Sequence, residues 1–124
     1  MSYSDPYSER VRALFGDPAH AGTLDGPSVR IDDQGVRIEI SAALAAGTLE
    51  KLAFRAYGCP HTIAAAEAFC ADFEGREAEA LEGFSGADLM QNLPVPHEKT
   101  GRILVLEDAV RSLGAKCRDS KMNS

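Results

Sequence analysis

The sequence predicts an α+β fold in which a three-stranded antiparallel sheet is covered on one face by helices. Residues 28–57 contain three segments in which apolar and polar residues alternate, separated by connections of only a few residues. Such short connections are typical of antiparallel neighbours. From Pro60 onwards the apolar spacing changes to that of a helix, so strands and later helices are segregated along the chain.

The first two strands are predicted in "PSVRID" and "VRIEI", where valine and isoleucine alternate with charged residues. The "DDQG" segment between them supplies turn residues, and its Gly35 can adopt positive φ. A second turn is predicted in "AAG" at 45–47. The third strand is predicted in "TLEKLAFRAYG", whose alternation is less regular and which ends in Gly58.

Helices are predicted before and after these strands in the sequence. A first helix is expected in "SDPYSERVRALF", where "GDP" ends it, and a second near 60–74, ended by Gly75. A short helix is expected in "REAEALEGF" and another in "SGADLMQNL", with Ser85 as its N-cap. The Pro-rich "LPVPHEKTG" is expected to be extended, and a final amphipathic helix follows near 102–115. The last residues, "CRDSKMNS", are predicted to be a frayed tail.

The composition is that of an ordinary globular protein, and residues 1–124 are predicted to form a single domain. The net charge of −6 argues against binding to nucleic acid or to an anionic membrane, because no basic stripe is available. No apolar run approaches the roughly 20 residues that a membrane span needs. The start of the chain lacks the pattern of a signal peptide, so a cytoplasmic protein is expected.

Cys59 is the one cysteine whose position suggests chemistry. Pro60 is favoured at the first position of a helix, which would make Cys59 the N-cap. Its thiol would then face unpaired backbone N–H groups and the positive end of the helix dipole, and both favour the thiolate. His61 could add positive charge or accept a proton. The alternative is that Cys59 is a small residue filling a tight strand-to-helix corner.

The other candidate residues give weaker signals. Cys70 lies in a helical apolar stripe and is expected to be structural, and no role is assigned to Cys117. The odd number of cysteines argues against a complete disulfide framework. The three histidines and the "DDQG" aspartates have commoner roles in loops and turns than metal binding, and no phosphate-binding glycine loop or serine elbow is present.

The sequence resembles the IscU/NifU-type family of iron–sulfur cluster scaffolds over nearly its whole length. "FRAYGCPHTIAAAEAF" resembles the family's Gly-Cys segment, and "ILVLEDAV" resembles its Leu-Ala-Glu-Asp-Ala-Ile helix. "YSERVRALFGDPAHAG" resembles the N-terminal helix and the Asn-Pro loop, with Asp17 in place of asparagine, and "LPVPHEK" resembles the Leu-Pro-Pro-Val-Lys loop. The resemblance implies a SufE/NifU-like fold with a three-stranded antiparallel sheet.

The family's site uses three cysteines and an aspartate, and only the central cysteine carries over, as Cys59. The first cysteine belongs in the turn that here contains Asp32 and Asp33. The third belongs at the start of the last helix, where Gly101 and Arg102 stand, so that a positive charge occupies a thiolate position. Because an iron–sulfur cluster is held mainly by thiolates, one chain is expected to hold no stable [2Fe–2S] cluster by itself.

The resemblance leaves three functions open, none of them enzymatic. The chain could be a divergent scaffold or accessory protein that handles iron or a transient cluster through Cys59, a SufE-like acceptor of persulfide on Cys59, or an adaptor without metal chemistry. Cysteine desulfurase and other iron–sulfur assembly proteins are the expected partners. If metal chemistry survives, the loops carrying Asp33, Cys59, His61 and His97 are expected to meet at one end of the sheet and to bind iron or zinc.

Overall fold

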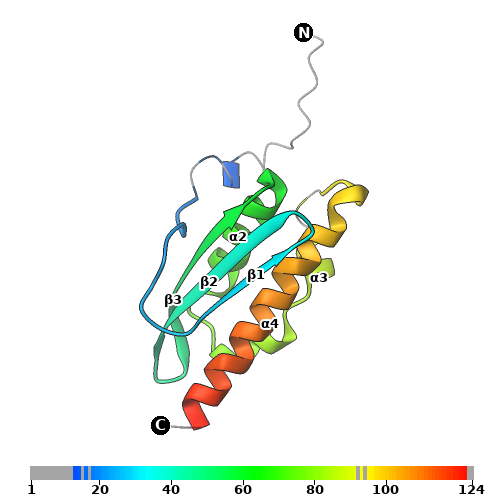
Figure 1. Ribbon diagram of the computed structural model, residues 1–124. Helices are drawn as coiled ribbons and strands as arrows, with labels where there is room; N and C mark the ends of the chain where they lie inside the picture. Colours follow the sequence, from blue (N-terminus) through cyan, green and yellow to red (C-terminus); the bar gives the residue numbers. More distant parts are fainter. Residues whose placement is uncertain (1–12, 15, 17, 92, 94, 123–124) are drawn as a thin grey trace, which may run out of the picture.

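The computed structural model describes residues 13–122, except for 15, 17, 92 and 94 (Figure 1). The helix predicted in "SDPYSERVRALF" therefore lies almost entirely outside the described residues. None of the described helices is long and apolar enough to cross a membrane.

The predicted antiparallel meander is confirmed. The three strands are β1 (Ser28–Asp33), β2 (Val36–Ala45) and β3 (Thr48–Tyr57). They lie in the order β1-β2-β3, and both pairings are antiparallel. Each connection is a two-residue turn whose central residues have positive φ: 52° and 75° at Gln34 and Gly35, and 55° and 83° at Ala46 and Gly47. Positive φ at both positions matches the twist of a tight hairpin, which holds the ends of adjacent strands together.

A β-bulge explains the irregular pattern of the third strand. Ala43 pairs with Lys51, but the next residue of β2, Leu44, pairs with Leu49. Glu50 is therefore an extra residue on β3, and every side chain before it changes face. As a result Leu49 and Leu52 are both buried on the core side, although simple alternation would place them on opposite faces.

In the described part of the chain, five helical segments follow the sheet. They are α2 (Pro60–Phe73), the 3₁₀ helix η1 (Ala78–Gly83), α3 (Gly86–Met90), the 3₁₀ helix η2 (His97–Lys99) and α4 (Thr100–Met122). Ser85 caps α3 as predicted, because its Oγ accepts the N–H of Asp88 at 3.3 Å. The prediction of a frayed tail that begins at Cys117 was wrong for residues 117–122, because α4 continues to Met122. Cys117 is buried against the core, and Arg118 reaches Glu82 of η1 with 2.6 Å between Nη1 and Oε1.

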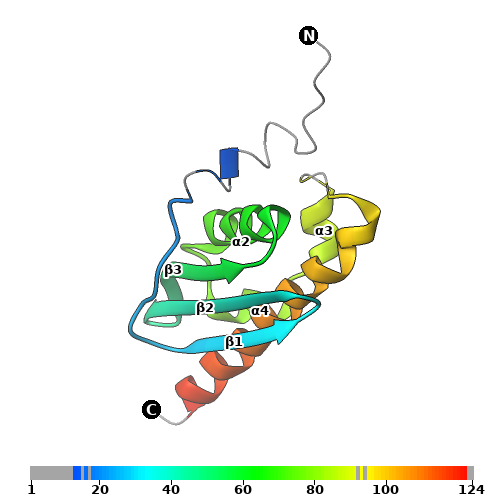
Figure 2. The same ribbon diagram turned by 45° about the horizontal axis from the view of Figure 1, so that its top comes forward.

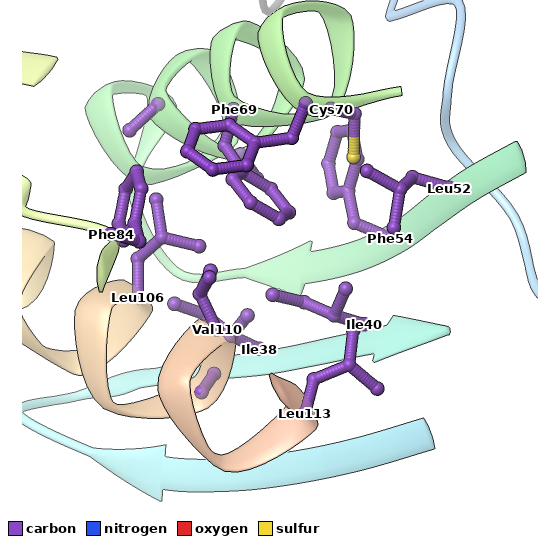
Figure 3. Close-up of a cluster of buried hydrophobic side chains, with 14 of the residues drawn as sticks. Ile38, Ile40, Leu52, Phe54, Phe69, Cys70, Phe84, Leu106, Val110 and Leu113 are labelled. Atoms are coloured by element: carbon purple, nitrogen blue, oxygen red, sulfur yellow. The ribbon is translucent and has the colours of Figure 1, made fainter. Parts of the chain in front are cut away.

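The core lies between one face of the sheet and the helices. α2 covers β3, whereas α4 crosses β1 and β2 (Figures 1 and 2). Figure 3 shows the isoleucines of β2 and Phe54 of β3 pointing toward Phe69 of α2 and the leucines of α4. Phe69 also packs against Phe73 and Phe84, with ring centroids 5.1 and 5.2 Å away. This core fixes how the first residues of α2 and α4 stand relative to the sheet.

The segment that precedes β1 is fastened to the outer edge of β3 and to α2. Phe54 donates its N–H to His20 O at 2.9 Å and accepts the N–H of Gly22 at 2.8 Å. Glu67, which is buried in α2, accepts the backbone N–H of His20 at 2.8 Å and contacts its ring, with 2.5 Å between Nδ1 and Oε2. The other ring nitrogen lies 3.3 Å from Glu74 Oε1. A loop histidine thus connects three parts of the fold.

Candidate functional site

Three segments meet at one end of the domain: the β1–β2 turn, the corner that leads into α2, and the start of α4 (Figure 1). Gly58 packs directly on the turn, because a Cβ added to it would lie 2.6 Å from the carbonyl oxygen of Gly35. A Cβ on Gly101, in the first turn of α4, would lie 3.6 Å from Oε1 of Gln34. Side chains from distant parts of the sequence are therefore neighbours at this end.

Cys59 occupies the corner in the predicted N-cap position. Its backbone is extended, with φ −149° and ψ 127°, and Pro60 is the first helical residue. The carbonyl oxygen of Cys59 accepts the N–H groups of Thr62 at 3.0 Å and Ile63 at 3.1 Å, which are the first hydrogen bonds of the helix. The sulfur makes no capping hydrogen bond of its own. The thiol is left for other interactions at this end of the domain.

The surroundings of Cys59 favour its thiolate. Burial opposes ionisation, but the guanidinium of Arg102, positioned to donate to the sulfur, has the largest opposite effect. The backbone N–H groups of Thr62 and His61, at the start of α2, act in the same direction by hydrogen bonding, and so does the charge of Lys99. Together these groups hold the pKa of Cys59 below its ordinary value of 9.0. The local prediction of an activated thiol gains a physical cause, with Arg102 as its main contributor.

The other two cysteines lie in different environments. Only 2% of Cys59 is exposed, yet fewer atoms surround its sulfur than surround that of Cys70. Burial raises the pKa of Cys70 strongly, and the nearby carboxylates of Glu67 and Glu74 raise it further. Burial also raises the pKa of Cys117. All three cysteines are free, and only the pKa of Cys59 is lowered.

We expect Cys59 to be alkylated faster than Cys70 and Cys117 in the folded protein near neutral pH, because its lowered pKa leaves more of its sulfur as the reactive thiolate. Pulsed iodoacetamide labelling followed by peptide mapping measures the three rates. In denaturant the three rates should converge. Faster labelling of Cys70 or Cys117 in the folded protein would contradict the assignment.

His61 is buried beside this corner, with 1% of the residue exposed. Burial lowers the pKa of its imidazole, and the positive charges of Lys99 and Arg102 lower it further, while Glu98 opposes them. The imidazole is therefore neutral at neutral pH. A neutral ring can accept a proton or bind a metal, whereas it adds no positive charge to the site.

The remaining predicted metal ligands are differently engaged. Asp33 Oδ1 accepts the N–H of Gln34 at 2.8 Å and so stabilises the turn. Asp32 Oδ1 lies 2.7 Å from Arg37 Nε. His97 is exposed at the start of η2. Among the described residues, no three histidine, cysteine, aspartate or glutamate side chains gather closely enough to hold a metal ion. A metal site built from Asp33, Cys59, His61 and His97 stays a prediction.

The donor set does not fit an iron–sulfur cluster. All three cysteines lie in the described part of the chain, and only Cys59 is at this end. Cys70 is eleven positions further along α2, about 16 Å at 1.5 Å per residue. Cys117 lines a cleft with Leu44 and Ala46, beside the β2–β3 turn at the opposite end of the sheet. One thiolate beside a guanidinium offers no four-ligand set for a cluster.

The three-stranded antiparallel sheet with its covering helices is the α+β fold of NifU-like domains. The crystal structure of a nitrogen-fixing NifU-like protein (N-terminal) from Brucella abortus superposes with a TM-score of 0.70 at 16% identity, covering 90% of this chain and 94% of that one. A candidate SUF-system scaffold, SufU of Fervidobacterium islandicum AW-1, superposes with a TM-score of 0.59 at 16% identity, covering 90% and 87%.

The sequence comparison points to the same relatives. The chain is 20% identical to the iron–sulfur cluster assembly scaffold protein IscU of Buchnera aphidicola subsp. Acyrthosiphon pisum (strain APS), over 94% of this chain and 98% of that protein. No family model matches the chain. The resemblance to the IscU/NifU type is confirmed as a similarity, at 20% identity over 94% of the chain.

Proposed function

We propose that this chain acts in iron–sulfur cluster assembly as a divergent scaffold homologue or accessory protein that carries sulfur on Cys59. The names of the similar Buchnera and Fervidobacterium proteins support a role in iron–sulfur cluster assembly. The sulfur chemistry is supported by one observation. Among the described residues, the only cysteine at the end of the domain where the β1–β2 turn, the corner before α2 and the start of α4 meet is Cys59, and the guanidinium of Arg102 favours its thiolate. Persulfide transfer needs one thiolate, whereas a cluster needs several.

The reaction moves one sulfur atom without net oxidation. The Cys59 thiolate attacks the outer sulfur of a persulfide on a cysteine desulfurase. The bond between the two donor sulfurs breaks, a new S–S bond forms on Cys59, and the donor cysteine leaves as its thiolate. Because Cys59 is only 2% exposed, the donor must displace part of the structure that covers this residue. The chain would be a carrier in this step and not an enzyme.

Incubation with a cysteine desulfurase and cysteine tests the proposal. After trapping with iodoacetamide, intact-mass analysis should show the addition of one sulfur atom, and peptide mapping should place it on Cys59. Cys59→Ser should abolish the addition. Cys117→Ala is the matched control, since that cysteine lies at the opposite end of the sheet.

A wild-type chain that acquires no sulfur from an active desulfurase would refute the carrier function. Sulfur on Cys70 or Cys117 in place of Cys59 would refute the assignment of the site. An intact [2Fe–2S] cluster that survives desalting on the monomer would favour the scaffold function over the carrier function.

A further inference from the structure

A cleft of about 770 Å³ opens at the end of the domain opposite Cys59, and the carrier function makes no use of it. Its walls are the β2–β3 turn, η1 and the last turns of α4, which lie together in Figure 1. The volume is within the range of about 300–1,000 Å³ that is common among ligand sites. We call it the η1 cleft, and its lining includes Leu44, Glu77, Ala78, Glu79, Glu82 and Arg118.

Hydrogen bonds and close packing hold the walls of the η1 cleft in place. Ala78 donates its backbone N–H to Gly47 O at 2.9 Å, which ties η1 to the β2–β3 turn. Arg118 Nη1 lies 2.6 Å from Glu82 Oε1, and a Cβ added to Gly114 would lie only 2.9 Å from Cγ of that glutamate. The helix α4 therefore also packs closely against η1. The cleft is pre-formed, so a ligand that enters it has little ordering of the walls to offset.

The η1 cleft combines apolar surface with unpaired negative charge. Leu44 is half-buried in its lining and supplies apolar surface. Glu77 and Glu79 are exposed, and neither forms an ion pair with another of the described residues. Arg118, the one cation among the described lining residues, is already bound to Glu82. Three carboxylates and one guanidinium leave the cleft with a net charge of −2.

Together these two properties favour long basic side chains as the occupants. The methylene stem of a lysine or arginine packs on apolar surface while its charged head stays at the edge of a cleft, where it meets carboxylates. An acidic segment would be repelled, because the whole chain carries a net charge of −6 in addition to the negative charge at the cleft. A purely apolar segment would desolvate the carboxylates of Glu77 and Glu79 without pairing them.

We propose that the η1 cleft is a docking site for a segment of a partner protein in which lysine or arginine residues are interspersed with apolar ones. The proposal does not rest on the carrier function, since it involves neither Cys59 nor sulfur. Because the cleft and Cys59 are at opposite ends of the sheet, a segment bound in the cleft leaves the approach to Cys59 open.

The probe is a fluorescein-labelled dodecapeptide of leucine and lysine, and fluorescence anisotropy measures its binding to the chain. A peptide with glutamate in place of every lysine is the control and should not bind. E77K/E79K should weaken binding of the basic peptide at least about tenfold. D25K/E50K changes the net charge equally at exposed positions outside the cleft and should weaken binding no more than about threefold. Thermal unfolding checks that both double variants are folded.

A second measurement uses the wild-type chain alone. Saturating basic peptide should slow the alkylation of Cys117, which lines the cleft, at least about fivefold and should leave that of Cys59 unchanged. Equal losses of affinity in the two double variants would overturn the proposal, because binding would then follow net charge alone. Failure of the basic peptide to bind saturably below about 1 mM would overturn it too, as would protection of Cys59 in place of Cys117.

Discussion

Replacing Phe69 with alanine is expected to lower the free energy of unfolding by about 3–5 kcal/mol, as is typical of a deleted core phenylalanine. The Phe69 side chain is fully buried between α2 and the sheet. Its ring centroid lies 5.1 Å from that of Phe73 and 5.2 Å from that of Phe84, so the substitution removes contacts with two further aromatic rings. The cavity would open at the centre of the packing that joins α2 to the segment before α3.

Urea denaturation followed by circular dichroism measures this effect, and an unchanged slope would show that the compactness of the two states is preserved. Leu104→Ala is the matched control. Leu104 is an apolar residue of α4 that is 46% exposed, so its loss should change stability by no more than about 0.5 kcal/mol. Similar losses in the two variants would mean that the aromatic cluster does not organise the core.

The sequence contains most of what is needed to predict this fold, because the elements have strong local signals. Alternating residues, two turn segments and the change of period at Pro60 indicate the meander and the helix after it. The bulge at Glu50 was not predictable, since an extra residue in one strand leaves both faces looking mixed. The length of α4 was also missed. Its last turns are held by the burial of Cys117 and by an ion pair to η1, which are tertiary contacts.

The candidate site, like the fold, could be predicted from the sequence only in part. The sequence predicts Cys59 as an N-cap because Pro60 marks the start of a helix, which is a local signal. The family resemblance implies that Arg102 brings a positive charge to the place of a ligand cysteine. The approach of that guanidinium to the sulfur depends on how α4 crosses the sheet, and no local pattern encodes such a crossing. The resemblance to a known family supplied the clue that these two residues share one end of the domain.

The pair formed by His20 and Glu67 had no signal in the sequence. The two residues are 47 positions apart, one in a loop and the other in an alanine-rich helix. A loop histidine usually has no structural role, and a glutamate in a helix is usually solvated. Here the glutamate side chain is only 7% exposed and the histidine 17%, because the segment before β1 folds back along the edge of β3.

Replacing His20 with alanine is expected to cost about 3 kcal/mol, the upper part of the range for a buried polar group that loses its partner. Glu67 would keep the backbone N–H of residue 20 but lose the imidazole, and Glu74 would lose its contact with the other ring nitrogen. A double-mutant cycle with Glu67→Ala isolates the pair. A coupling energy near zero would show that the two side chains do not stabilise each other.

The contribution of this pair should depend on pH in a defined direction. Burial opposes protonation of His20, but the hydrogen bonds and charges of Glu67 and Glu74 outweigh it and raise the pKa of the imidazole above 6.5. The native state therefore binds this proton more tightly than the unfolded state. The resulting stabilisation is complete below about pH 6.5 and is lost as the pH rises through the folded-state pKa. The difference in unfolding free energy between wild type and His20→Gln should accordingly shrink as the pH rises from about 6 through the folded-state pKa of His20. A difference that grows over this interval would mean that the imidazole is held in its neutral form, and that the connection between the segment before β1 and α2 is an uncharged hydrogen bond.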